Sequence, residues 1–191
     1  MALLKRRGYD PIASHGGDEA LAIMKTVKPD LILLDIMMEP MDGWETLAHF
    51  KSNPETADIP VLMFSAKKIT PEEAKEHAIN IEDFVSKPVN PVQLLEAIQR
   101  IFARRTAVKS EVSEAKDAGH DAIIVDEYAA LRKSIEVDTN LLCVLKKSTG
   151  MEQGVCEVRA DDLAAVRTLE EKIKTDEQRL REISGKFVRP E

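Results

Sequence analysis

A run of aliphatic residues that ends in an aspartate, LILLD at residues 31–35, constrains the fold of this chain more than any other feature. Such a continuous apolar run predicts a strand that is buried on both faces, as in a parallel sheet covered by helices. The acid that ends the run, Asp35, is then expected at the carboxyl edge of the sheet, where open α/β folds bind ligands. A loop containing Met41-Asp42-Gly43 follows, and a helical pattern begins after it.

Two more predicted strands end in polar residues of complementary chemistry. Residues 61–64 read VLMF and lead to Ser65, and residues 83–86 read DFVS and lead to Lys87. Since neighbouring parallel strands lie about 4.8 Å apart, Lys87 is expected within about 10 Å of Asp35, a distance that its long side chain can cover.

A carboxylate, a hydroxyl and an ammonium at one sheet edge suit phosphoryl transfer. The carboxylate attacks phosphorus, and the other two groups bind the oxygens of the transferred phosphoryl group. Amphipathic segments at residues 44–50 and 71–78 separate the three strands, which is the pattern of an α/β fold.

These segments together resemble the receiver domains of two-component response regulators. The matching text is LLDIMMEPMDGWE, VLMFSA and EDFVSKPV, and residues 8–30 resemble the second strand and second helix of that family. The resemblance covers residues 1–105 and implies a flavodoxin-like, doubly wound parallel sheet. It also implies that Asp35 is the phosphoacceptor and Lys87 the active-site lysine. By the same resemblance, Ser65 is the Ser/Thr switch residue and Phe84 the aromatic switch residue.

Family members begin with a strand that ends in two acids, and these acids hold Mg²⁺ with the phosphoacceptor and a main-chain carbonyl. Here residues 1–9 instead look like the last turns of a helix that Gly8 stops. We therefore expect a receiver that lacks its first strand and acid pair, with roughly 15–20 residues absent. It would be either an incomplete version of a longer protein or a degenerate domain. The resemblance leaves Asp35 and the main-chain carbonyl of Met37 as metal ligands, a poor cage for Mg²⁺.

The remainder of the chain predicts helices. A helix from Pro91 to about Ala103, capped by Asn90, ends the receiver, and residues 106–119 are either a linker or an extension of this helix. Two amphipathic helices follow, joined by a glycine-containing loop. Their heptad positions hold Ile124, Tyr128, Leu131, Ile135, Leu142 and Leu145, then Val166, Leu169, Ile173, Leu180 and Ile183, with Asp138 and Asp176 as interruptions.

We expect residues 120–191 to form an α-helical hairpin that serves as a dimerisation or output module. Its apolar seam would pack against the receiver, another protein or a second copy, the last giving a homodimer through residues 120–185.

Composition argues against several other classes of protein. Residues 107–191 hold 14 basic and 18 acidic residues without a helix-turn-helix pattern, so no nucleic-acid partner is expected. The chain has no apolar run of 18 residues and no signal peptide, so no membrane association is expected. Its two cysteines fit no metal spacing and are expected as free thiols in a cytoplasmic protein.

The sequence thus predicts a response regulator that accepts a phosphoryl group on Asp35 from a histidine kinase and signals through its helical module. Such a protein is a phosphoacceptor, and its only chemistry is self-phosphorylation and dephosphorylation, so we do not expect an enzyme. One alternative is a degenerate receiver that acts as a phosphorylation-independent scaffold. Another is a phosphotransfer protein that uses His120, because His120-Asp121 opens the hairpin as a His–acid pair does in histidine kinases.

Overall fold

The computed structural model describes residues 2–66, 73, 80–148 and 160–187 of the chain. Its elements are α1 (Ala2–Arg6), α2 (Gly17–Ile23), β1 (Ile32–Asp35), α3 (Gly43–Ser52), β2 (Val61–Ser65), β3 (Asp83–Ser86), α5 (Pro91–Asp117), α6 (Ala122–Ser148) and α7 (Ala160–Phe187). Apart from residue 73, the predicted amphipathic segment 71–78 lies outside the described residues.

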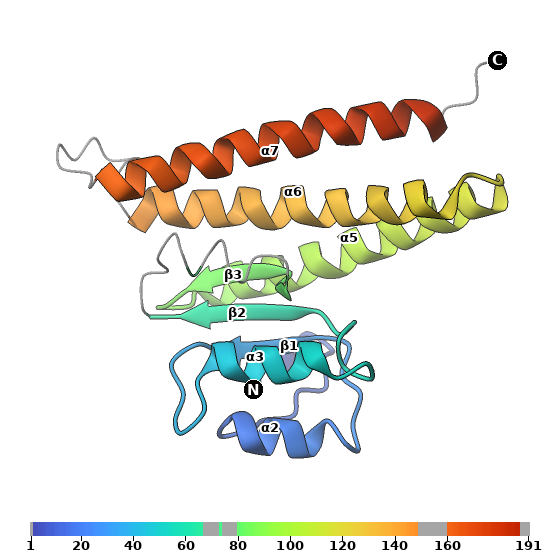
Figure 1. Cartoon of the computed structure of the whole chain (residues 1–191). Helices are drawn as coiled ribbons and strands as arrows, with labels where there is room; N and C mark the ends of the chain where they lie inside the picture. The colour runs from blue at the N-terminus through green and yellow to red at the C-terminus, as the bar shows by residue number, and fades with distance from the viewer. Residues whose placement is uncertain (1, 67–72, 74–79, 149–159, 188–191) are drawn as a thin grey trace.

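The three predicted strands form one parallel sheet in the order β1-β2-β3, so the flavodoxin-like α/β prediction is confirmed (Figure 1). No strand occurs within residues 2–31 of the described chain. Residues 9–14, which resemble a strand of the family, have no strand structure here, and the side chain of Ile12 is 57% exposed. Pro11 has no N–H to donate to a strand ladder, which disfavours pairing of this segment.

Helices cover both faces of the sheet because each strand alternates its side chains between two apolar clusters. On one face, Leu34, Met63 and Phe84 belong to a buried cluster that includes residues of α3 and α6. On the other face, Leu62 and Val85 belong to a cluster with residues of α5. The sheet is therefore doubly wound, with α6 covering the same face as α3.

Helix α5 continues through residues 106–117. Of the two alternatives that the sequence left open for this segment, the structure therefore has the helix extension and not the linker. The Asn90 side chain accepts a hydrogen bond from the Val92 N–H, as its predicted role as N-cap requires. Gly119 ends this region with a φ of +81°, a conformation that favours glycine. None of the described helices is long and apolar enough to cross a membrane.

Helices α6 and α7 form the predicted antiparallel hairpin, and α6 also lies along β3 and α5 (Figure 1). The predicted stripe is correct for α7, where Val166, Ile173 and Ile183 are buried. On α6, however, Val137 and Leu141 are fully buried although the heptad pattern did not include them. They belong to the cluster that contains the sheet residues, because α6 is covered by the receiver on one side and by α7 on another.

The two acids that interrupt the heptads meet in the hairpin. Asp138 is almost fully buried and pairs with Lys172, whose Nζ lies 3.5 Å from the Asp176 carboxylate. The Ser134 hydroxyl oxygen lies 3.2 Å from the Asp138 carboxylate and 3.0 Å from the Asp176 carboxylate, so its single proton can be donated to either acid. These polar groups satisfy one another inside the seam, which explains how an apolar stripe tolerates two acids.

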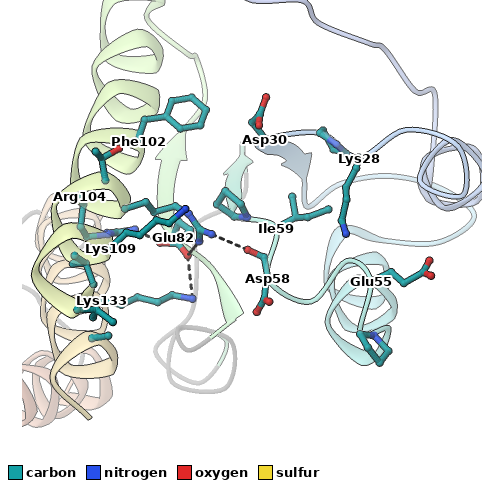
Figure 2. A pocket seen from close by; sticks show the side chains of 18 residues that line it. Lys28, Asp30, Glu55, Asp58, Ile59, Glu82, Phe102, Arg104, Lys109 and Lys133 are labelled. Carbon is teal, nitrogen blue, oxygen red and sulfur yellow. Dashed lines mark hydrogen bonds and ion pairs between the residues drawn. The ribbon is translucent and has the colours of Figure 1, made fainter. Parts of the chain in front are cut away.

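A second ionic cluster, which we call the Glu82 cluster, joins the receiver to the helical extension (Figure 2). Glu82 lies directly before β3, and its side chain is 4% exposed. Its carboxylate pairs with Arg104, with Arg105 at 3.4 Å and with Lys133 of α6 at 3.2 Å. Arg104 also lies 3.3 Å from Glu136 of α6. One buried carboxylate therefore ties α5 and α6 to the amino end of β3.

Candidate functional site

The carboxyl edge of the sheet brings Asp35 and Lys87 into contact. Asp35 ends β1, Lys87 follows β3, and the two residues are 52 positions apart in the sequence. The Lys87 ammonium donates to Asp35 Oδ2, and the two side chains are 32% and 22% exposed. The pair is thus open to solvent on one side, and a reactant could approach the carboxylate.

The loop after β1 orients the other oxygen of this carboxylate. The main-chain N–H of Met37 donates to Asp35 Oδ1 at 3.1 Å. The loop is held because Gly43 donates from its N–H to the carbonyl of Ile36 at 2.9 Å, and Asp42 caps α3 by accepting from Glu45. A Cβ at Gly43 would lie 2.1 Å from the Asp35 carbonyl oxygen, so only glycine fits this close approach.

Ser65 and Phe84 lie on the sheet face that α6 covers. Ser65 ends β2 and is buried, and its carbonyl accepts a hydrogen bond of 2.7 Å from the Lys87 N–H. Phe84 is buried in the same cluster as Leu141 and Leu145 of α6. The structure thus places the predicted hydroxyl at the same edge as Asp35, and the predicted aromatic switch against the helical hairpin.

The donor set at Asp35 does not form a cage for the Mg²⁺ that the resemblance implies. Both oxygens of Asp35 already accept from protein donors, namely Lys87 and the Met37 N–H. Within the described part of the chain, no group of three or more His, Cys, Asp or Glu side chains could hold a metal ion. One carboxylate and the carbonyl of Met37 leave most of the six positions around Mg²⁺ without protein ligands.

His120 lies in the connection between α5 and α6, which is at the end of α6 remote from the carboxyl ends of the strands (Figure 1). Its neighbour Asp121 caps α6, because the Asp121 carboxylate accepts from the Ile123 N–H at 2.8 Å. The acid of the His–acid pair therefore has a structural role here.

A cavity of about 860 Å³ lies at the opposite, amino edge of the sheet and contains the Glu82 cluster (Figure 2). The loops before β1 and β2 form one wall, with Lys28 and Asp58, and the extension of α5 forms the other. Three of its cationic side chains are already paired with Glu82. The cavity is therefore a cleft between receiver and helices, remote from the Asp35 carboxylate.

The sequence reasoning missed one aromatic residue at the site. Lys87 Nζ lies 4.8 Å from the centroid of the Phe64 ring. The signal was present in the sequence, since Phe64 is the residue before Ser65 on the predicted strand between Asp35 and Lys87. A lysine side chain that reaches from Lys87 to Asp35 has to pass over the side chain of the strand residue that pairs with Asp35, which is Phe64.

Comparisons with known proteins agree with this arrangement. The family model of the response regulator receiver domain matches residues 1–99, and the model of Metanogen output domain 2 matches residues 104–191. The chain is 36% identical over 97 residues to protein PilG of Pseudomonas aeruginosa, an alignment that covers 51% of this chain and 72% of PilG.

A longer alignment relates the chain to the alkaline phosphatase synthesis transcriptional regulatory protein PhoP of Bacillus subtilis. The two are 30% identical over 143 residues, which cover 71% of this chain and 58% of PhoP. For the phosphate regulon transcriptional regulatory protein PhoB of Escherichia coli, the identity is 29% and the coverage of that protein is 44%. The chain thus spans about half the length of these two regulators.

Solved structures of receivers are similar as well. The N-terminal domain of a response regulator receiver protein from Methanoculleus marisnigri JR1 is 54% identical, covering 53% of this chain and 83% of that one, with a TM-score of 0.44. Chemotaxis protein CheY4 of Vibrio cholerae is 29% identical, covering 52% and 83%, with a TM-score of 0.49. Since the receiver model matches more than half of the 191 residues, this chain belongs to the family of response regulator receiver domains.

Proposed function

We propose that this protein accepts a phosphoryl group on Asp35 from a histidine kinase and passes the change to its C-terminal helices. One observation carries the proposal: the Lys87 ammonium contacts the Asp35 carboxylate across the carboxyl edge of the sheet. Here a partly exposed carboxylate is oriented by Lys87 and by the Met37 N–H.

The chemistry needs only one bond exchange. A carboxylate oxygen of Asp35 attacks the phosphorus of a phosphohistidine, the O–P bond forms, and the N–P bond breaks with its electron pair on the imidazole. Lys87 and the Met37 N–H supply positive charge and a hydrogen-bond donor where the phosphoryl oxygens would gather. The product is an acyl phosphate, whose added negative charge Lys87 partly neutralises.

The face that carries Ser65 and Phe84 offers a route for the signal. A phosphoryl group on Asp35 would draw the Ser65 hydroxyl toward it, and the packing of Phe84 beside it would adjust. Phe84 shares a buried cluster with Leu141 and Leu145, so the first element to respond would be α6. The proposal therefore makes the hairpin the output module, in line with the description of the family model that matches residues 104–191.

A phosphorylation-independent scaffold is the second candidate, and the poor Mg²⁺ cage favours it. In that case the Asp35–Lys87 pair would be structural, and α6 would stay fixed on the receiver. The kinase partner, the cytoplasmic location, the homodimer and the lack of nucleic-acid binding stay predictions.

Phosphorylation by a small phosphodonor separates the two candidates. We expect acetyl phosphate or phosphoramidate, with Mg²⁺ in excess, to label the wild-type chain and not Asp35→Asn. Lys87→Ala should bind the donor but lose the structural response, because its ammonium acts on the bound phosphoryl group. The matched control is Lys109→Ala, which removes an exposed lysine from the cleft at the other edge.

Hydrogen exchange then reads the signal. Labelling should accelerate amide exchange in residues 137–145 of α6 in the wild-type chain and in Lys109→Ala, and leave Lys87→Ala unchanged. Label that persists in Asp35→Asn, at His120 for instance, would contradict the assignment. A wild-type chain that takes no label, or one that is fully labelled without any change in α6, would favour the scaffold.

A further inference from the structure

The path of Lys87 to Asp35 crosses a whole strand. Lys87 follows β3, Asp35 ends β1, and β2 lies between them in the sheet. In the register of the sheet, Asp35 pairs with Phe64 of β2, and Phe64 pairs with Val85 of β3. Because register partners project to the same face, Asp35, Phe64 and Val85 form a row across the sheet that the lysine side chain has to span.

The Phe64 ring fills the middle of this row. It is half-buried and packs on the cluster that contains Leu62 and Val85, so the sheet and α5 fix it from below. Above it, Lys87 Nζ lies 4.8 Å from the ring centroid while the same ammonium contacts Asp35 Oδ2. The ammonium thus has two attractive neighbours, the carboxylate ahead of it and the aromatic face beneath it.

An aromatic ring attracts a cation through its quadrupole within about 6 Å of the centroid, and an aliphatic side chain of similar size does not. A lysine side chain is flexible and loses much rotamer freedom when its ammonium is held in one place. A ring at mid-span therefore favours the extended conformation that delivers the ammonium to Asp35 and disfavours those that return it to solvent.

We infer that Phe64 is a positioning residue for phosphoryl transfer: its ring holds the Lys87 ammonium over β2 and in place at Asp35. The inference rests on the proposed function, since it assigns the ring a part in the reaction of that site. The competing explanation is that Phe64 is only a core residue, which its contacts with the α5-side cluster would equally produce.

Three substitutions separate the two explanations. Phe64→Leu removes the ring but keeps an apolar side chain, and Phe64→Tyr keeps the ring. Leu62→Val is the matched core control, because Leu62 lies on the same face of β2 and is fully buried, but it stands two residues before Phe64 and pairs with Asp83 at the other end of β3. Thermal melts of all variants would show how much stability each change costs.

Two readouts are needed. In NMR spectra, the ring current of Phe64 should shift the Cε protons of Lys87 upfield, and Lys87→Arg would identify that signal by its loss. We expect Phe64→Leu to return the signal to its ordinary position and to slow labelling by phosphoramidate about two- to fivefold. Phe64→Tyr should keep both the shift and the rate, and Leu62→Val should leave both near wild type.

The inference is wrong if Phe64→Leu loses the shift but is labelled at the wild-type rate. It is also wrong if Leu62→Val slows labelling as much as Phe64→Leu at an equal loss of stability, or if Phe64→Tyr behaves like Phe64→Leu. A wild-type chain that takes no label at all defeats the proposed function itself and this role with it. In the other cases wild-type labelling stays intact, so the two failures are distinguishable.

Discussion

Replacing Glu82 by glutamine should strongly destabilise the protein, because this substitution removes the carboxylate charge that pairs with Arg104, Arg105 and Lys133. The side chains of Glu82 and Arg104 are 4% and 6% exposed. Glutamine has nearly the same size, so the change leaves no cavity and tests the charge alone. After the substitution the Arg104 guanidinium stays buried with Glu136 as its acidic partner, 3.3 Å away and on α6.

The magnitude follows from the burial of this pair. Removing one partner of a buried ion pair costs about 3–5 kcal/mol, because the other charge is left without compensation. Arg105 and Lys133 are 43% and 32% exposed and can turn to water, and Arg104 keeps Glu136, so the lower end of that range applies. For a chain of this length, about 3 kcal/mol lowers Tm by roughly 6–12 °C.

Thermal unfolding followed by circular dichroism measures this loss, with Glu170→Gln as the matched control. Glu170 pairs with Lys146 at 2.7 Å, but both side chains are about one-third exposed, so its loss should cost less than about 1 kcal/mol. Adding Arg104→Met to Glu82→Gln should recover part of the stability, because the buried charge is then also removed. A Tm of Glu82→Gln equal to that of Glu170→Gln would refute the reasoning.

Three further perturbations test other parts of the structure. Gly43→Ala should cost about 1–3 kcal/mol in a denaturant titration and slow the labelling of Asp35, because the new Cβ would collide with backbone after β1. Leu141→Ala should lower the free energy of unfolding by about 2–5 kcal/mol and accelerate amide exchange in β3, because α6 packs on the sheet. An increase in exchange confined to α7 would argue against this packing. Burial, with the charge of Lys133 next, lowers the pKa of Lys51 to about 8, while the unfolded chain keeps the ordinary value of 10.5. Above pH 8 the unfolded chain therefore binds more protons at Lys51 than the folded one, so this residue should make the protein more stable as the pH rises to about 10. Near pH 10 the raised pKa of Tyr128 lowers stability with rising pH instead. In melts from pH 8 to 9.5, Lys51→Met should flatten this rise, and an unchanged slope would contradict it.

The sheet and its reactive edge could be predicted because their signals are local. Two strands are short apolar runs that stop at Asp35 and Ser65, and the third, around Phe84 and Val85, leads to Lys87. Parallel order then brings Asp35, Ser65 and Lys87 to one edge. The pattern predicted the first strand as residues 31–34, and the structure has Ile32–Asp35, a shift of one residue at each end. The N-cap Asn90 and the break at Gly119 were likewise visible as single residues.

What could not be predicted depends on contacts between distant segments. A heptad pattern describes one face of a helix, and α6 has a second buried face with Val137 and Leu141 because the receiver covers it. The Glu82 cluster joins the residue before β3 to residues of α5 and α6, and nothing in the sequence near Glu82 distinguishes it from an exposed acid. The ring of Phe64 beneath Lys87 likewise follows only from the register of β1, β2 and β3.

The most direct test of the central claim identifies the atom that carries the phosphoryl group. Borohydride reduces an aspartyl phosphate to homoserine, so the labelled wild-type chain would be reduced, digested and sequenced by mass spectrometry. Our account predicts homoserine at position 35, absent without phosphodonor and reduced in amount in Phe64→Leu. Homoserine at another aspartate, or a phosphorylated chain with intact Asp35 and phosphate on His120, would contradict it.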